Sequence, residues 1–321
     1  MASATEPLLR VAEAKLPPFA FPALLAANVA LATGAWFVRV ADTGPIATGF
    51  WRLALVVPLL LPFALTGAGG PVRLSRGTLA MIVTGGLFFA SDLASWHLGI
   101  MRTKLANATL FGNCSSLLLP FAGILLTRIW PTRLQWVALA CAMVGAMLLM
   151  GSSYELSRQN LAGDLLCLLA GLLYVFYLLS VQSVRRSLST FWVLGLSSLA
   201  SAPLMLVYAW MAGERILPGN WGPVIGLMLT CQVVGQGLMV YAIAHFPPLV
   251  VGLVLLTQPA VAALIGWLAF GETLSAPDWA GALIIALALV LIRLPARDSM
   301  RDESLRDKAP QGAPDPLGRD A

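Results

Sequence analysis

Long apolar segments separated by short polar turns repeat along the whole chain. A segment of about 20 mostly apolar residues can cross a bilayer as an α-helix, because each residue adds about 1.5 Å. Turn-forming residues such as Thr43-Gly44-Pro45 and Pro247-Pro248 separate the segments. The pattern predicts ten transmembrane helices, at 21–40, 46–66, 77–99, 105–127, 133–151, 161–183, 190–212, 221–243, 248–270 and 277–295.

Composition supports a membrane location. Hydrophobic residues make up 59% of the 321 residues and charged ones 11%, far from the roughly half apolar and quarter charged mix of soluble domains. We therefore expect an all-α integral membrane protein. Residues 1–20 form a polar cytoplasmic segment without the features of a cleaved signal peptide. Residues 296–321 are charged and proline-rich, which predicts a disordered cytoplasmic tail.

The basic residues indicate an orientation. With both termini in the cytoplasm, most of the 20 Lys and Arg residues fall on the cytoplasmic side, six of them from Arg293 onward. Arg39, Arg52 and Arg102 are among those near the opposite face. The bias favours both ends inside. Because the basic residues are dispersed and form no patch, the net charge of +5 does not indicate nucleic-acid binding.

The two halves of the chain share a pattern. Residues 117–150 and 256–292 each contain a proline within a helix, a short polar turn, a Trp and a helix rich in small residues. Pro120 corresponds to Pro259, and Trp136 to Trp279. We expect two five-helix repeats, 21–151 and 161–295, which run in opposite senses because five is odd. Inverted repeats of this kind recur in secondary transporters, with the substrate site near the bilayer midplane.

Several short motifs carry a family resemblance: Gly49-Phe50-Trp51-Arg52, the prolines Pro120 and Pro259, and Gly271-Glu272 followed by Trp279 and Gly281. Over roughly residues 20–295 the chain resembles the ten-helix, EamA-type branch of the drug/metabolite transporter superfamily. The resemblance implies a two-repeat exporter of small metabolites, often amino acids, with both termini cytoplasmic. The first repeat has Ile129 where the family often has a Gly-Glu turn. Glu272 either acts in function or stabilises the loop at the helix end.

Polar and aromatic side chains within the predicted helices are candidates for substrate binding. Amides and hydroxyls also join helices by hydrogen bonds, so each has a structural alternative. Gln232 and Gln236 are four residues apart and share a helix face, where they either line a cavity or hold a neighbouring helix. Asn28 and Tyr177 also lie away from helix ends. The predicted substrate-binding residues are Trp36, Asp92, Trp96, Asn113, Tyr174, Gln232, Gln236, Tyr241 and Gln258.

Asp92 is the strongest single candidate, because an ionisable group inside hydrocarbon is costly and usually functional. It either accepts a proton coupled to transport or pairs with the amino group of a zwitterionic substrate. The alternative is a structural ion pair with Arg52, and Arg39 is a second possible partner. His97 lies roughly 140° around the same helix from Asp92. The two therefore form no local dyad, and we expect His97 to be an interfacial residue.

The sequence gives little support for a metal site, a cofactor, ATP-driven transport or catalysis. Two His residues and four Cys residues in apolar segments, without a CxxC motif, indicate neither a metal site nor a cofactor. The absence of GxxxxGK[ST] argues against an ATP-driven pump. A membrane-embedded enzyme that modifies lipids is a remote alternative, because the short loops lack grouped carboxylates or His residues. A membrane scaffold or sensor is a third possibility.

The sequence thus predicts a secondary transporter, not an enzyme, in a bacterial-type plasma (inner) membrane. It would export small neutral metabolites, with amino acids favoured, by alternating access through a central cavity between the repeats. An exporter of drugs or other amphiphilic metabolites is the alternative. We expect the small-molecule substrate and the lipid bilayer to be its partners, and a chain with two repeats to work as a monomer.

Overall fold

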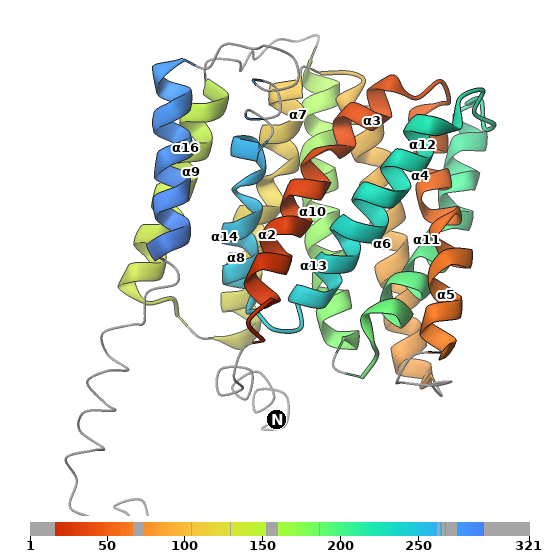
Figure 1. The fold of residues 1–321 in the computed structure, drawn as a ribbon, viewed down its shortest axis with the longest axis horizontal. Coiled ribbons are helices and arrows are strands. Elements are labelled where there is room, and N and C mark those ends of the chain that lie inside the picture. The colour runs from red at the N-terminus through yellow and green to blue at the C-terminus, as the bar shows by residue number, and fades with distance from the viewer. Residues whose placement is uncertain are drawn as a thin grey trace, which may run out of the picture.

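The computed structural model describes residues 17–66, 74–103, 105–128, 130–151, 160–185, 187–261 and 275–291, together with Leu264 and Trp267. These residues form a bundle of helices that run alongside one another (Figure 1). The predicted terminal segments before residue 17 and after residue 291 lie outside the described residues, as does Glu272. The helices of the N-terminal half are α2 (Ala20–Ala32), α3 (Gly34–Val40), α4 (Pro45–Ala54), α5 (Val56–Thr66), α6 (Arg76–Ile100), α7 (Leu105–Gly112), α8 (Cys114–Thr127) and α9 (Arg133–Gly151). Those of the C-terminal half are α10 (Leu161–Val184), α11 (Thr190–Met211), α12 (Trp221–Leu227), the π-helix η2 (Met228–Gln236), α13 (Gly237–Ala242), α14 (Pro248–Leu255) and α16 (Ala276–Leu291).

Several helical stretches are long and apolar enough to cross a membrane. Within the described part of the chain, six meet that condition: Ala20–Val40, Pro45–Thr66, Arg76–Ile100, Leu161–Val184, Thr190–Met211 and Trp221–Ala242. Shorter apolar helices at Cys114–Leu126, Arg133–Leu148, Pro248–Val261 and Ala276–Leu291 lie within the other predicted spans. The predicted all-helical membrane class is confirmed for the described part of the chain. The total of ten crossings stays a prediction.

Side chains at the helix starts explain the boundaries. Ser75 Oγ accepts a hydrogen bond from the Thr78 N–H at 3.0 Å and caps α6. Asn220 Oδ1 accepts from the Gly222 N–H at 2.9 Å and caps α12. Pro45 begins α4, where its missing N–H leaves no hydrogen bond unmade. These residues stand at the start of apolar segments, so the predicted starts at 77, 221 and 46 lie within one residue of the observed ones.

Among the described residues, five of the predicted transmembrane segments contain an interruption of the regular α-helix. Thr33 separates α2 from α3, Leu55 separates α4 from α5, Asn113 separates α7 from α8, and Leu256-Thr257 follow α14. In the path from α12 to α13 the backbone takes the wider π-helical form over Met228–Gln236. Such interruptions release backbone groups for other partners, and π-helical turns occur frequently at functional sites.

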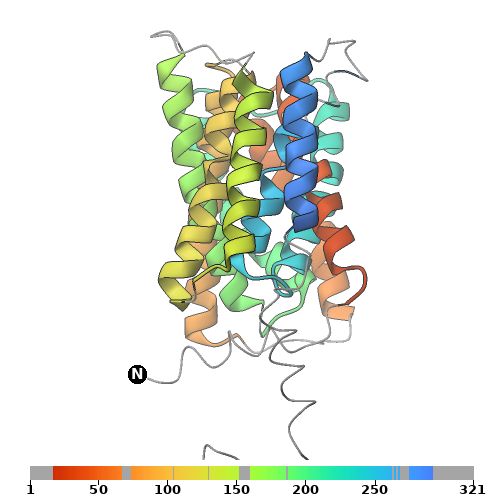
Figure 2. The same cartoon turned by 90° about the vertical axis from the view of Figure 1, so that its left-hand side faces the viewer.

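Helices of the N-terminal half pack mainly against helices of the C-terminal half. Neighbouring pairs are α6 with α10 and α11, α4 and α5 with α11, α8 with α14, and α2 with η2 and α13. The helices α9 and α16 stand side by side at one edge of the bundle (Figures 1 and 2). A Cβ atom on Gly145 of α9 would lie 2.7 Å from the Gly281 carbonyl oxygen of α16. The two helices therefore approach each other through glycine, as is common in membranes.

Candidate functional site

A buried arginine lies between the two halves. Arg52 of α4 is only 3% exposed. Its Nε donates a hydrogen bond to Gln232 Oε1 of η2 at 2.8 Å, and Gln232 Nε2 donates to Ser198 Oγ of α11 at 3.1 Å. The guanidinium carbon also lies 6.0 Å from the centre of the Phe89 ring of α6, within the range of a cation–π contact. Arg52 thus joins helices from both halves through polar and aromatic contacts.

Asp92 of α6 lies in the same region, 7% exposed. Arg52 acts on its carboxylate electrostatically, but within the described residues no hydrogen bond or ion pair reaches it. The described residues thus show no direct ion pair between Asp92 and Arg52, whose guanidinium contacts Gln232 and Phe89. Arg39, the other candidate partner, donates to the carbonyl oxygens of Ile100 and Thr103 at 3.0 and 3.4 Å.

Two tyrosines of α10 extend the cluster. Phe89 stacks on Tyr177 with ring centres 4.2 Å apart and planes 12° from parallel. Tyr174 lies beside Tyr177 at 5.9 Å, and its hydroxyl donates to Gln236 Oε1 at 3.2 Å. The buried Tyr177 hydroxyl has no hydrogen-bond partner among the described residues. We call Arg52, Phe89, Asp92, Tyr174, Tyr177, Ser198, Gln232 and Gln236 the central cluster.

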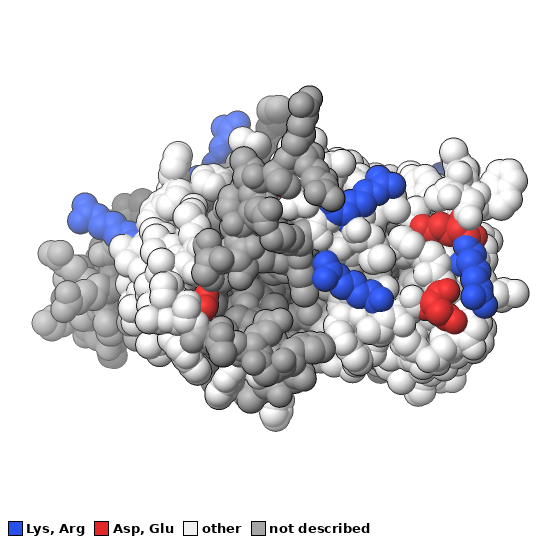
Figure 3. All heavy atoms as spheres, turned by 90° about the horizontal axis from the view of Figure 1, so that it is seen from above, with Lys and Arg blue, Asp and Glu red and all other residues white. Residues whose placement is uncertain are grey.

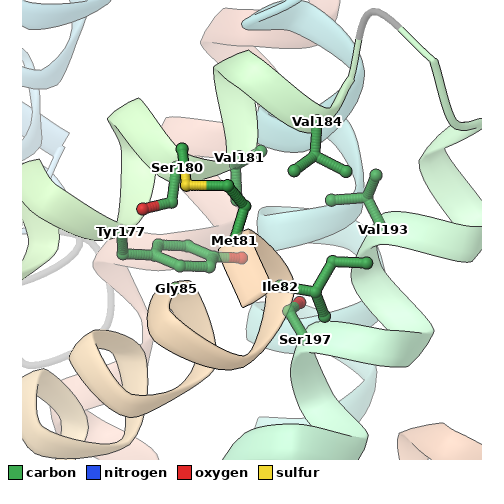
Figure 4. A pocket seen from close by; sticks show the side chains of 9 residues that line it. All are labelled: Met81, Ile82, Gly85, Tyr177, Ser180, Val181, Val184, Val193 and Ser197. Carbon is green, nitrogen blue, oxygen red and sulfur yellow. The ribbon is translucent and has the colours of Figure 1, made fainter. Parts of the chain in front are cut away.

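A small pocket adjoins the central cluster at Tyr177 (Figure 4). It has room for about one water molecule. It lies toward the end of the bundle where α6 begins and α10 ends, and three helices supply its walls. Its lining residues are Met81, Ile82, Gly85, Tyr177, Ser180, Val181, Val184, Val193 and Ser197.

Asn28 and Gln258 form a second polar group. Asn28 is fully buried; its amide nitrogen donates to the Val254 carbonyl oxygen at 2.6 Å and also to Thr257 Oγ1. Gln258 Nε2 in turn donates to Asn28 Oδ1 at 2.8 Å. At the interruption after α14 the Val254 carbonyl oxygen accepts hydrogen bonds from Thr257 as well as from Asn28. Gln258 thus lies where α2 contacts the segment after α14.

The remaining predicted residues are dispersed. The half-buried Trp96 packs near Gly34, Gly112 and Cys231, beside the interruptions of three paths. Asn113, 7% exposed, sits at the interruption between α7 and α8. Tyr241 is half-buried and meets His245 edge-on at 4.9 Å near the end of α13.

Two placements expected from the sequence are wrong. Trp36 was expected to face the interior but is 45% exposed and packs on Phe37. His97 was expected at an interface but is fully buried, with Nδ1 2.7 Å from the Pro45 carbonyl oxygen. The helix α6 continues to Ile100, and the start of α4 covers His97.

The structure also brings in residues that were not selected as site residues. Arg52 was treated as an orientation charge and a structural partner, and Phe89 and Ser198 were not considered. The position of Arg52 inside an apolar segment is the signal that could have identified it. Among the described residues, no group of three His, Cys, Asp or Glu side chains is arranged to bind a metal ion.

Hydrogen bonds join two loops at the end of the bundle opposite the pocket. Glu214 accepts hydrogen bonds from the Ala47 N–H at 2.8 Å and the Ile46 N–H at 3.3 Å, at the start of α4. Asp42 Oδ2 accepts from the backbone N–H groups of Gly219 and Asn220 at 2.9 and 3.0 Å. Acidic and basic side chains gather together toward one edge of this face (Figure 3). The α3–α4 loop is thereby fixed to the α11–α12 loop.

Comparisons with known proteins relate this fold to transporters. Residues 161–294 match the EamA-like transporter family. The chain is 27% identical over 277 residues to an uncharacterized transporter of Archaeoglobus fulgidus, covering 84% of this chain and 95% of that protein. It is 28% identical over 223 residues to the uncharacterized inner membrane transporter YedA of Escherichia coli (strain K12), covering 68% and 69%.

A structural comparison agrees with this relationship at the level of the fold. A solved crystal structure aligns with a TM-score of 0.69 at 17% sequence identity, covering 92% of this chain and 99% of that one. At this identity the likeness concerns the fold alone. The family match and the relatives indicate a transporter rather than an enzyme. The chain is thus similar to membrane transporters over most of its length and to the EamA-like transporter family over residues 161–294.

Proposed function

We propose that the protein is a secondary transporter that exports small neutral metabolites, with amino acids as the favoured class. Transport would occur by alternating access through the space between two inverted halves. The observation that carries this proposal is the central cluster, in which Arg52, Asp92 and Gln232 come from helices of both halves and are buried. Buried ionisable groups within membrane helices usually mark a substrate or ion pathway.

The pattern of neighbouring helices supports the two inverted halves. The second, fourth and fifth predicted helices of one half pack on their counterparts in the other, as α4 and α5 with α11, α8 with α14, and α9 with α16. The third helix of each half packs on the first of the other, as α6 with α10 and η2 with α2. A two-fold relation between the halves would produce these same pairs.

Interrupted helices near the cluster support a site at this depth. Secondary transporters commonly bind substrates where helices are discontinuous, because the freed backbone groups can take part in binding. Trp96 lies beside the interruptions at Thr33 and Asn113 and beside the π-helix at Cys231. The pocket next to Tyr177 lies at the end that the sequence predicts to be cytoplasmic, and it would become the inner access route.

The charges of the cluster favour a small neutral substrate. One buried cation and one buried anion would suit a molecule of no net charge, whereas a multiply charged substrate would call for several cations. The largely apolar lining of the pocket in Figure 4 favours the second candidate, an exporter of amphiphilic organic molecules. We place the protein in a bacterial-type inner membrane with both termini cytoplasmic, working as a monomer.

Uptake by proteoliposomes tests the proposal. The purified protein is reconstituted and offered a panel of labelled neutral amino acids and, separately, a fluorescent amphiphilic cation, with protein-free liposomes as the control. Saturable uptake of one or more amino acids above the control is the expected result. Uptake of the amphiphile alone would favour the second candidate, and uptake of neither would contradict both.

A further inference from the structure

Arg52 has binding capacity that the protein does not use. A guanidinium group carries five N–H donors in a planar fork. Only Nε has a hydrogen-bond acceptor, Gln232 Oε1 at 2.8 Å; no other hydrogen bond from this guanidinium is found within the described residues. Among the described residues its Nη1 and Nη2 groups have no protein acceptor, and they are not fully closed off from solvent although the side chain as a whole is only 3% exposed. A buried cation that is only partly hydrogen-bonded is costly unless a ligand completes it.

Asp92 presents the opposite charge under similar conditions. It is 7% exposed, and its carboxylate lies farther from Arg52 than the 4.0 Å of an ion pair. Phe89 and Asp92 are three residues apart on α6 and therefore share a helix face. Arg52 lies over the Phe89 ring, and the two charges are close enough to act on each other electrostatically.

Neighbouring side chains keep the two charges apart. Gln232 binds the Nε edge of the guanidinium, and Ser198 fixes the amide of Gln232. On another side Phe89 supports the guanidinium, and Phe89 is itself stacked on Tyr177. The protein thus holds a cation and an anion in one buried region without allowing them to neutralise each other.

We propose that Arg52 and Asp92 form a divided-charge site for a zwitterion, binding the substrate carboxylate at the free Nη groups of Arg52 and its ammonium group at Asp92. This inference rests on the proposed transport of amino acids. A carboxylate fits the guanidinium fork with two parallel hydrogen bonds. A zwitterionic ligand would pair with both Arg52 and Asp92, whereas a ligand with a single charge would leave one of the two residues unpaired.

Competition by charge-deleted analogues tests the site. Proteoliposomes take up a labelled amino acid that the wild-type protein transports, in the presence of its α-amide, which lacks the carboxylate, or its deaminated acid, which lacks the ammonium group. Each analogue should compete at least about tenfold more weakly than the unlabelled amino acid, because each leaves a buried charge unmatched. Equal competition by either analogue would overturn the divided-charge site.

Variants assign each charge to its residue. Arg52→Gln should lower amino-acid uptake at least about tenfold and abolish the preference for the amino acid over its α-amide. Arg39→Gln is the matched control, since Arg39 is a basic residue of the same half that binds only carbonyl oxygens. Unchanged discrimination in Arg52→Gln, with uptake retained, would overturn the assignment.

A second variant keeps the test decisive if Arg52→Gln does not fold. Gln232→Glu places a carboxylate of nearly the same shape 2.8 Å from Arg52 Nε, where it forms an internal ion pair. This variant should remain folded, as judged by its thermal unfolding, yet lose most amino-acid uptake because the guanidinium is already neutralised. Full uptake by a folded Gln232→Glu protein would contradict the site. Failure of amino-acid uptake by the wild-type protein would instead refute the proposed substrate class, and this inference with it.

Discussion

Asp92 is the residue at which stability and function oppose each other. A buried carboxylate without a direct partner destabilises a protein, whereas a hydrogen-bonded one can stabilise it. Asp164 provides the contrast within the same chain: it is 3% exposed and accepts a hydrogen bond from Thr103 Oγ1 at 2.6 Å. Retention of an unpaired Asp92 is thus better explained by transport than by folding.

Asp92→Asn should therefore abolish most transport while raising thermal stability. Removing the unpaired charge should raise Tm by roughly 2–4 °C, and uptake in proteoliposomes should fall at least about tenfold. Asp164→Asn is the control and should lower Tm, because it weakens the bond from Thr103. If Asp92→Asn left both the transport rate and its pH dependence unchanged, the functional role of Asp92 would be refuted.

Single residues were predicted unevenly from the sequence. Asp92, Tyr174, Gln232 and Gln236 could be selected because polar groups in an apolar segment are conspicuous. Their partners could not, since Gln232 meets Arg52 across 180 sequence positions. Trp36 and His97 were misplaced because their surroundings depend on a helix interruption and on the covering start of α4.

At the scale of helices, the crossing of α8 and α14 is a close junction near the interruptions. Pro120 cannot donate to the Ser116 carbonyl oxygen, which leaves that oxygen without its helical hydrogen bond. Gly252 of α14 lies directly over this point: a Cβ atom there would be 2.6 Å from both Ser116 O and Pro120 Cδ. The glycine allows the two helices to approach where the proline disturbs α8.

Gly252→Ala should destabilise this junction by about 1–3 kcal/mol, because backbone cannot move aside as a flexible side chain would. Thermal unfolding of the purified protein measures the loss. Gly237→Ala is a matched control in a helix, since a Cβ atom there meets only Leu194 Cδ2 at 3.6 Å, an ordinary contact. Equal stability of the two variants would show that α8 and α14 are less closely packed than described.

The positions of the helices were predictable, but their interruptions were not. Apolar runs and turn residues are local signals, so α6 and α11 begin within one residue of their expected starts. Thr33 lies within an apolar run, and no proline next to it signals the interruption. The Val254 carbonyl oxygen at the interruption after α14 also accepts a hydrogen bond from Asn28, 226 positions away, which no local pattern could indicate.

At the scale of the whole molecule, orientation in the membrane follows from the placement of the loops. Leu217 and Ser187 are exposed and lie in the loops at opposite ends of α11. With both termini cytoplasmic, Ser187 faces the cytoplasm and Leu217 the outside. The basic residues support this orientation through a moderate bias only.

Cysteine labelling measures the orientation. In intact cells an impermeant maleimide should modify Leu217→Cys, whereas Ser187→Cys should react only after the membrane is opened. The wild-type chain gives the background, because its own cysteines all lie within helices: Cys114, Cys141, Cys167 and Cys231. The reverse pattern would place both ends of the chain outside.

The sequence predicted the class of molecule better than its working site. Hydrophobicity suffices to predict an all-helical membrane protein, whereas the two related halves inferred from the repeated Pro and Trp pattern stay a prediction. The central cluster depends on how α4, α6, α10, α11 and η2 pack together, which only the structure supplies. The structure therefore separates the predicted polar residues into the central cluster and the group around Asn28. The sequence did not indicate which residue belongs to which group.

Counterflow tests most directly the claim that a substrate site between the halves alternates between the two sides. Proteoliposomes are loaded with an unlabelled mixture of neutral amino acids and diluted into a trace of one labelled member at a time. A carrier should accumulate at least one label transiently above its equilibrium level, and Asp92→Asn and protein-free liposomes should not. Simple filling to equilibrium without an overshoot, or no uptake of any member, would contradict the account.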